Sequence, residues 1–181
     1  MHQLVKKTLE SFINDKKILA SSDIPEEFKS FSSTKEAVFV SLYHNGRVIA
    51  SSGRIQCQKE NTLYECIDNT LLCLKDPRFN SSLQSSENLA NIHIRVDLFG
   101  HENRRMIQKI SELSIRDEGL IFLSQNLGIM SIVLPHMIHL DPTPEKYFNL
   151  ACQKAGLDPI KLVPSDYILY ALKTREYTDM A

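Results

Sequence analysis

The 181-residue sequence predicts an α+β fold with a largely antiparallel or mixed sheet. Segments with helical periodicity are interspersed with pairs of short β-rich segments that tight turns connect, as in hairpins. The regular alternation of strand and helix that a parallel sheet requires is absent. At 43% hydrophobic residues the chain is long enough to bury a core, and we expect one domain over residues 1–181.

A helix and a hairpin are the first predicted elements. Apolar residues at helical spacing predict an amphipathic helix over 3–19. The β-rich segment 37–43 has apolar residues on both faces, which predicts a buried strand. Asn45-Gly46 predicts a tight hairpin turn. The second strand begins at Val48 and then runs into small residues, which is unusual because glycine weakens a strand.

A second helix and a third strand follow. An apolar stripe predicts a helix over 61–75, which Pro77 ends. Apolar and polar residues alternate over 91–99, which predicts a half-exposed antiparallel strand. Its polar face, which we expect to be solvated unless it lines a pocket, consists of His93, Arg95 and Asp97.

The remaining sequence predicts two more helices and three strands. Residues 104–114 have the pattern of a short helix, and 119–124 and 129–134 that of a hairpin. Residues 144–155 predict a helix, because a proline suits its first turn and a glycine its end. Residues 166–172 predict a last strand.

Composition excludes several classes of function. A net charge of −1 and an isoelectric point near 6.6 give no basic surface, so we expect no nucleic-acid binding. No window reaches the length of a membrane span, and the N-terminus lacks the pattern of a signal peptide, so we expect a cytoplasmic protein without membrane association. We expect reduced, mostly buried thiols at Cys57, Cys66, Cys73 and Cys152.

Motifs for cofactors are missing. The sequence contains no glycine-rich dinucleotide or phosphate-binding loop, no zinc-protease motif and no nucleophile-elbow motif, so we expect no cofactor.

Asp76-Pro77-Arg78-Phe79 predicts a turn at a helix end, in which the aspartate accepts from nearby backbone N–H groups. Arg78 then either binds an anionic ligand group or pairs with an acid of this chain.

A histidine pair near residue 136 is the candidate for a metal site. On a helix, His136 and His139 would share a face and could bind a metal with Asp141. Pro135 and Pro142 bracket this segment, however, and indicate an extended chain, on which residues three apart point to opposite faces. We therefore expect no metal site, and place His136 at the edge of a cleft.

Five segments together resemble one known family. They are EAVFVSLYHNGR (36–47), LLCLKDPRFNSSL (71–83), IHIRVDLF (92–99), GLIFLSQNLGIMSIVLPHM (119–137) and NLACQKAGLD (149–158). They are similar to the AMMECR domain family, whose prokaryotic branch is called AmmeMemoRadiSam system protein A. The resemblance covers roughly residues 4–177.

The resemblance implies a fold and partners, but no settled reaction. The implied fold is a barrel-like mixed, mostly antiparallel sheet with flanking helices, forming a larger and a smaller lobe around a cleft. The family is frequently encoded beside a MEMO-like protein and a radical S-adenosylmethionine protein, which are therefore the expected partners. A small-molecule ligand in the cleft is a further expectation.

The sequence departs from the family at its most distinctive motif. Relatives carry Leu-Arg-Gly-Cys-Ile-Gly just after the hairpin turn, where this chain has Val48 to Gly53. Ser51 stands in the place of the cysteine, and the arginine is absent, although Arg54 lies close by. The usual Leu-Pro-Gln ends in His136 here. A shared cysteine-based reaction is therefore in doubt.

Two functions follow as hypotheses. The first is a non-catalytic module that binds a partner protein or a small ligand at Ser51, Ser52, Gly53, Arg54, Arg78 and His136. The alternative is an enzyme, or an accessory enzyme subunit, in a modification pathway linked to the radical protein. In that case Ser51 would lie beside His136, and Arg78 would bind an anionic group. The sequence alone identifies no catalytic residue.

Overall fold

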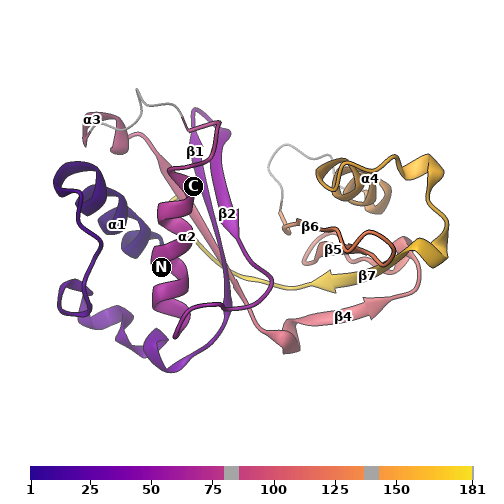
Figure 1. Cartoon of the computed structure of the whole chain (residues 1–181), viewed down its shortest axis with the longest axis horizontal. Coiled ribbons are helices and arrows are strands. Elements are labelled where there is room, and N and C mark those ends of the chain that lie inside the picture. The colour runs from indigo at the N-terminus through magenta and orange to yellow at the C-terminus, as the bar shows by residue number, and fades with distance from the viewer. Residues whose placement is uncertain (80–85, 137–142, 181) are drawn as a thin grey trace. The chain divides into compact units, whose positions relative to one another are not determined.

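Two compact units make up the chain in a computed structural model (Figure 1). The described residues are 1–79, 86–136 and 143–180. Unit 1 comprises Met1–Gly100 and Arg175–Ala181, and unit 2 comprises His101–Thr174. Each unit has its own four-stranded sheet, and the two are described separately.

The sheet of unit 1 has the strand order β2-β1-β3-β8, and every neighbouring pair is antiparallel. Its strands are β1 (Ala37–His44), β2 (Arg47–Gly53), β3 (His93–Phe99) and β8 (Arg175–Thr178). The helices of the unit are α1 (His2–Asp15), α2 (Thr62–Cys73) and the short α3 (Ser86–Leu89). Helices α1 and α2 pack against the sheet, α2 mainly on β1 and β2 (Figure 1). Strand β8 is an element that the sequence patterns did not predict.

Alternation along β1 and β3 builds the core of unit 1. On one face these strands contribute Val38, Val40, Leu42, Ile94, Val96 and Leu98, all at most 2% exposed. Helix α2 begins as the pattern predicts, because the Asn61 side-chain oxygen accepts the backbone N–H of Tyr64 at 3.1 Å. The predicted helix and the period of two in β3 are confirmed.

The opposite face of β3 is solvated as expected at His93, but not at Arg95 and Asp97. Arg95 is 2% and Asp97 0% exposed. The guanidinium of Arg95 donates to both carboxylate oxygens of Asp97, from Nε and Nη2 at 2.8 Å each, and lies 3.2 Å from Glu176. Residues two apart on a strand share a face, so a fork-like ion pair satisfies both charges and permits their burial. For Arg95 and Asp97 the prediction was wrong, because polar alternation in a sequence does not distinguish a face in water from a face that meets a partner of opposite charge.

The β1–β2 hairpin has the predicted turn. Asn45 and Gly46 have φ angles of 51° and 71°, as a tight two-residue hairpin turn requires. The pairing register shifts between Leu42 and Tyr43, and it then continues to Phe39 opposite Gly53. Strand β2 therefore stays paired through its small residues, and it forms an edge of the sheet.

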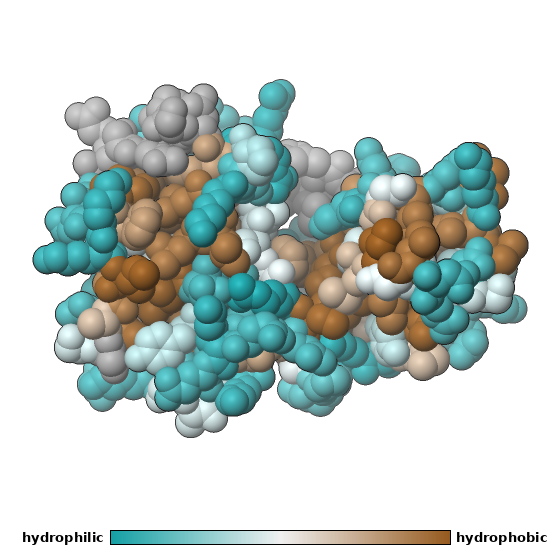
Figure 2. Space-filling model, viewed as in Figure 1, coloured by the Kyte–Doolittle hydropathy of each residue, from teal (hydrophilic) through white to brown (hydrophobic). Residues whose placement is uncertain are grey.

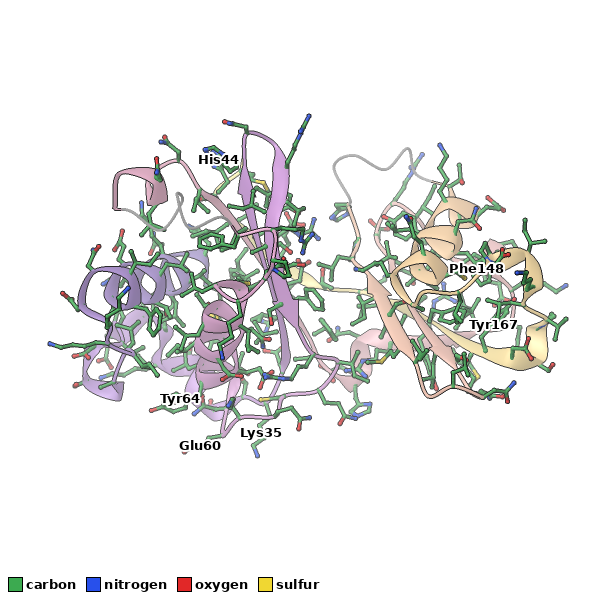
Figure 3. The ribbon with its side chains drawn as sticks, turned by 45° about the horizontal axis from the view of Figure 1, so that its top comes forward. Lys35, His44, Glu60, Tyr64, Phe148 and Tyr167 are labelled. Carbon is green, nitrogen blue, oxygen red and sulfur yellow. The ribbon has the colours of Figure 1, made fainter. Side chains whose placement is uncertain are left out.

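Unit 2 has the strand order β4-β7-β5-β6, again antiparallel throughout. Its elements are β4 (Arg104–Ile107), β5 (Gly119–Ser124), β6 (Met130–Val133), α4 (Pro144–Lys154) and β7 (Tyr167–Leu172). Helix α4 packs on β5 and β6. Phe148 of α4 and Tyr167 of β7 have ring centroids 5.2 Å apart, and both contact Phe122 (Figure 3). These aromatic contacts join the helix to the sheet.

The helix predicted over 104–114 is absent. Arg104 to Ile107 form β4, which pairs with β7, and a short 3-10 turn covers Ile110–Glu112. The Arg105 guanidinium donates from Nη2 and Nε to Glu118, at 2.7 and 3.0 Å. Tertiary pairing with β7 therefore overrides a weak local preference for helix.

The fold class is confirmed as α+β with antiparallel sheets, but the single barrel-like sheet is wrong. In the described ranges there are two separate four-stranded sheets, and neither closes into a barrel. A barrel closes when the two outer strands of its sheet pair with each other. In the described strand orders the outer strands, β2 and β8 in one sheet and β4 and β6 in the other, do not pair. The larger and smaller lobe around a cleft stays a prediction.

Part of the apolar surface of the described chain remains exposed. Figure 2 shows hydrophobic areas on the visible face of both units. The large apolar side chains most exposed to solvent are Ile18, Met106, Leu127, Ile160 and Val163. Across the part of the chain that the structure covers, no helix has the length and apolar character that a membrane crossing demands.

Candidate functional site

Four of the predicted site residues, Ser51 to Arg54, lie together at the end of β2, but their side chains do not all point to the same side of the strand. Side chains alternate along a strand, so Ser52 points to α2 and Ser51 to the other side. The Ser52 hydroxyl donates to Oδ1 of Asn69 on α2 at 3.0 Å. The Ser51 hydroxyl instead accepts a hydrogen bond from Arg78. One strand therefore serves two separate groups of polar residues.

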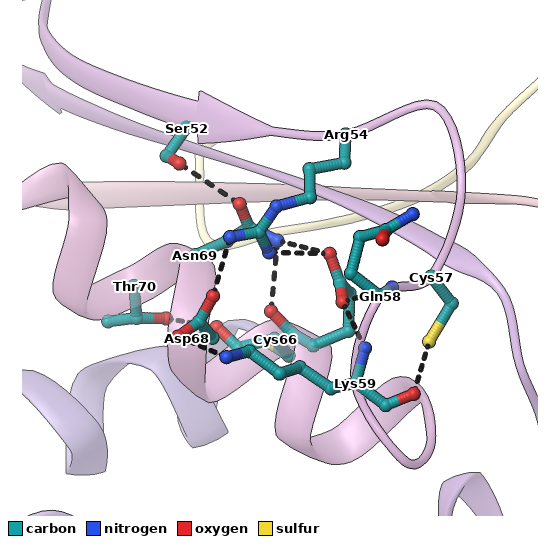
Figure 4. A network of polar contacts seen from close by, with 10 residues as sticks. Ser52, Arg54, Cys57, Gln58, Lys59, Cys66, Asp68, Asn69 and Thr70 are labelled. Carbon is teal, nitrogen blue, oxygen red and sulfur yellow. Dashed lines mark hydrogen bonds and ion pairs between the residues drawn. The ribbon is translucent and has the colours of Figure 1, made fainter.

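The first group, the Arg54 network, ties the end of β2 to α2 (Figure 4). Arg54 donates from Nη1 to Glu65 at 2.9 Å and from Nη2 to Asp68 at 2.7 Å. The hydrogen bond to Glu65 is the main reason why the pKa of Arg54 is raised. Lys59 adds an ion pair with Asp68 at 3.0 Å. Arg54 is therefore held by two carboxylates of its own chain.

Glu65 is the centre of the Arg54 network. Its side chain is 0% exposed. Its carboxylate also accepts the backbone N–H groups of Gln58 and Lys59, at 2.8 and 3.0 Å, and the Asn69 amide at 3.0 Å. A buried carboxylate needs this number of donors to offset its loss of hydration. The network thus fixes the chain between β2 and α2.

The second group, the Ser51 site, consists of Ser51, Asp76 and Arg78. One carboxylate oxygen of Asp76 accepts the Ser51 backbone N–H at 3.0 Å. The other accepts the backbone N–H and Nε of Arg78, both at 3.0 Å. Arg78 Nη2 donates to Asp76 at 2.7 Å and to the Ser51 hydroxyl at 2.8 Å. The expected ion pair of Arg78 with an acid of this chain is present.

The turn after α2 explains this geometry. The Phe79 N–H donates to the Asp76 carbonyl at 2.8 Å, which closes the predicted turn around Pro77. Asp76 accepts the N–H two residues on, as aspartates that open turns do. The hydrogen bond from Arg78 is the largest cause that lowers the pKa of Asp76 to about 2. The Asp76 side chain is 11% and that of Arg78 52% exposed, so the arginine is accessible while its partner is nearly covered.

Gly53 serves packing at this site. A Cβ atom at this position would lie 2.0 Å from Cδ2 of Phe39, on the neighbouring strand. The aromatic ring of Phe39 therefore covers the glycine, as aromatic residues do opposite glycines in sheets. The small residue leaves room for a side chain of this chain at that position.

The two buried thiols of α2 are poor nucleophiles. Burial raises the pKa of both Cys66 and Cys73 to about 12. Cys73 Sγ lies 3.7 Å from the Val40 carbonyl, to which it donates. Neither thiol takes over the role of the cysteine that Ser51 replaces.

His136 belongs to unit 2. Its Nε2 lies 2.6 Å from the Arg116 carbonyl oxygen, and its φ angle is 53°. The pairing of His136 with Ser51 stays a prediction. His139 and Asp141 lie outside the described residues, and within those residues no three potential ligands gather around a metal position.

Sequence reasoning missed two acids and one amide on α2. Glu65, Asp68 and Asn69 are spaced three and four apart, which places them on one helix face. This spacing is the signal that could have predicted a polar face toward β2. The sequence does not show, however, that this helix face lies within hydrogen-bond distance of Arg54.

The comparisons with known proteins give one family and one similar fold. A solved structure, that of the uncharacterised protein PH0010 from Pyrococcus horikoshii, is similar with a TM-score of 0.81 and 18% identity. The match covers 98% of this chain and 88% of that one, and it shows the fold alone. Among curated proteins, none matches. The AMMECR1 family profile matches residues 2–177, nearly the whole length, and the chain therefore belongs to the AMMECR1 family.

Proposed function

We propose that the chain is a non-catalytic module, which binds a partner protein or a small ligand through the Ser51 site. The observation that carries the proposal is the hydrogen bond in which the Ser51 hydroxyl takes part. It accepts a hydrogen bond from the guanidinium of Arg78 at 2.8 Å. A serine nucleophile needs a neighbouring base to take its proton, and a guanidinium is permanently protonated.

The other ionisable groups at the site are unsuited to proton transfer near neutral pH. A general acid or base works best when its pKa is close to the working pH. Asp76 has a pKa of about 2, so it is a weak base. Cys73 has a pKa of about 12, so its thiol stays protonated. These values favour binding over catalysis.

Arg78 is prepared for binding. Asp76 holds its guanidinium at two points, Nε and Nη2, while half of the side chain remains exposed. A group that is already oriented loses little conformational entropy when a ligand arrives. A partner that presents an oxygen acceptor would therefore find a donor in a fixed position.

The expected partners allow a direct test. We propose that the site binds the MEMO-like protein or the radical S-adenosylmethionine protein of the same organism. Each is purified, and its affinity for this chain is measured by calorimetry. Ser51→Ala should change the affinity less than about twofold, whereas Arg78→Ala should weaken it at least about tenfold, because it removes a central arginine contact. The matched control is Arg47→Ala, which removes an exposed arginine of β2, the strand that contains Ser51.

Two results would overturn the proposal. One is a calorimetric result against the site, either no binding to the two partners or binding whose affinity Arg78→Ala leaves unchanged. The other is a folded Ser51→Ala variant that fails to complement a deletion strain, because a hydroxyl that matters so strongly indicates chemistry. That second result would favour the alternative, an enzyme or accessory enzyme subunit.

A further inference from the structure

A cavity of about 240 Å³ lies at one end of the sheet of unit 2. Strand β4 begins there and β7 ends there, because the two strands pair antiparallel with Arg104 opposite Leu172 (Figure 1). The Lys173 N–H donates to the Asn103 carbonyl at 2.9 Å and extends this pairing. The cavity is lined by Glu102, Asn103, Arg104, Arg105, Glu118 and Lys173. All six residues belong to unit 2, and none belongs to the Ser51 site or to the Arg54 network.

The lining consists only of residues with polar or charged side chains. Sites for apolar ligands have walls of hydrophobic and aromatic residues, which this cavity lacks. Three of the lining side chains are cations and two are carboxylates, so one positive charge is in excess. The lining therefore favours a hydrophilic ligand with a single negative charge.

Two of these charges neutralise each other. Arg105 donates from Nε and Nη2 to the two carboxylate oxygens of Glu118, at 3.0 and 2.7 Å. The Glu118 carboxylate also accepts the Ser114 N–H at 2.9 Å. A bidentate pair of this kind is satisfied without a ligand. The excess positive charge therefore belongs to the two other cations, Arg104 and Lys173.

The chain compensates the charge of Arg104 only in part. Burial lowers the pKa of Arg104, and the nearby Glu102 carboxylate does not fully offset this effect. In Arg54, Arg78 and Arg105, hydrogen bonds to a carboxylate raise the pKa instead. The Nε atom of Arg104 is buried and makes no hydrogen bond with a described residue, although other interactions hold the side chain. An anion beside Arg104 would therefore be stabilised.

Lys173 provides the second cation. The residue is exposed, and its ammonium group forms no ion pair with any residue that the structure describes. An ammonium group has three donors and no fixed plane, so it can follow a carboxylate that the more rigid guanidinium of Arg104 orients. An anion in the cavity can thus be attracted by both cations.

The remaining lining residues suit hydroxyl groups. Glu102 is exposed, and its carboxylate oxygens can accept hydrogen bonds. The side-chain amide of Asn103 offers both donors and an acceptor. A second carboxylate on the ligand would be repelled by Glu102. A chain with several hydroxyl groups and one carboxylate therefore matches both parts of the lining.

We propose that this cavity binds a monocarboxylate with several hydroxyl groups, of the sugar-acid type. Its carboxylate lies between Lys173 and Arg104, and its hydroxyl groups form hydrogen bonds with Glu102 and Asn103. The Arg105–Glu118 pair stays intact beside it. This site is independent of the Ser51 site and of the function proposed for that site.

A titration with D-gluconate and two analogues of the same chain length tests the proposal. The ¹⁵N-labelled full chain is titrated with D-gluconate, with hexanoate, which lacks the hydroxyl groups, and with D-sorbitol, which lacks the carboxylate. D-gluconate should shift the backbone signals of Asn103 and Lys173 in a saturable manner. Hexanoate should bind at least about fivefold and D-sorbitol at least about tenfold more weakly, because they lack the neutral and the charged contacts respectively.

Two variants separate the contacts. Lys173→Gln, at an exposed position, should weaken D-gluconate and hexanoate at least about fivefold and leave D-sorbitol unchanged. Glu102→Gln keeps an oxygen acceptor but removes a negative charge, so hexanoate should bind at least about twofold more tightly. The matched control is Lys161→Gln, which removes a lysine whose side chain is 82% exposed and does not line the cavity. It should bind all three compounds as the wild type does.

The proposal fails if D-gluconate produces no saturable shift at Asn103 and Lys173. It fails equally if hexanoate or D-sorbitol binds as tightly as D-gluconate, or if Lys173→Gln binds D-gluconate as the wild type does. An equal loss in Lys161→Gln and Lys173→Gln would show a general effect of charge and would overturn the site as well. Because both lysines are exposed, these results do not depend on a variant that fails to fold.

Discussion

The Arg54 network and the Ser51 site begin on adjacent stretches of one strand, yet they differ in almost every physical property. The network is centred on Glu65, which is 0% exposed and accepts hydrogen bonds from both side chains and backbone. The Ser51 site is centred on Arg78, which is 52% exposed and is held by a single carboxylate. Alternation along the strand thus separates a group that stabilises the fold from a group that can contact a ligand.

The comparison also changes the meaning of the missing family arginine and cysteine. Arg54 lies close to the lost arginine in sequence, but it points to α2 and is neutralised by Glu65 and Asp68. Arg78, from the turn after α2, is the cation that contacts Ser51. Proximity in sequence therefore points to Arg54, whereas the hydrogen bond to Ser51 comes from Arg78 of the turn motif.

The largest effect is expected in the Arg54 network. Glu65→Ala should lower the free energy of unfolding by about 3 kcal/mol, because it removes one of the two carboxylates that bind Arg54 and leaves two backbone N–H groups without their acceptor. Urea unfolding of the variant and the wild type measures it. Glu60→Ala, at an exposed neighbouring position, should change stability by less than about 0.5 kcal/mol. Equal effects of the two variants would contradict a structural role for Glu65.

Gly53→Ala tests whether packing or ligand access requires the glycine between the two groups. The new methyl group would collide with the Phe39 ring, so we expect a loss of about 1–3 kcal/mol. Adding Phe39→Leu should recover part of that loss, which a double-mutant cycle measures. Simple additivity of the two losses would show that the ring is not the cause.

Ser51→Cys restores the family residue in the Ser51 site. The new thiol would lie beside the Arg78 guanidinium, which favours the thiolate and lowers its pKa. Near neutral pH it should react with iodoacetamide at least about tenfold faster than Cys66 and Cys73, whose pKa values are about 12. Mass spectrometry of the alkylated peptides gives the rates. If Arg78→Gln leaves the fast reaction unchanged, the guanidinium is not its cause.

The smallest effect concerns the pH dependence of the Ser51 site. The pKa of Asp76 is about 2 in the folded chain and 3.8 in the reference state, so its ion pair stabilises the fold above about pH 4. The contribution is lost as the pH falls toward 2. Since Arg78 is half exposed, we expect only about 1 kcal/mol. Asp76→Asn should therefore be less stable than the wild type at pH 6, and the difference should vanish near pH 2 in urea unfolding.

Local patterns predicted most of the fold. The helices at α1, α2 and α4 and the strands β1, β3, β5, β6 and β7 follow from periodicity, capping and turn residues. Strand β4 was mistaken for a helix because its pairing with β7 joins residues more than sixty positions apart. The division into two sheets depends on the same long-range pairing, which no local pattern contains.

The candidate site could be predicted only in part. The turn motif gave the Asp76–Arg78 pair, and the family motif pointed to Ser51. The direction of Arg54 was beyond reach, because the sequence does not show where the acids of α2 lie relative to β2. The burial of Arg95 and Asp97 was not predicted for a related reason, since a buried pair of opposite charges has the same sequence pattern as a solvated face.

The hydrogen bond from the Ser51 backbone to Asp76 also affects how the chain behaves toward copies of itself. Strand β2 is the outer strand of its sheet, and outer strands attract further strands from other molecules. Here a carboxylate already occupies the N–H that an incoming strand would need, and it brings a charge to the same border. The turn after α2 thus protects the chain against edge-to-edge aggregation in the same place where it orients Arg78.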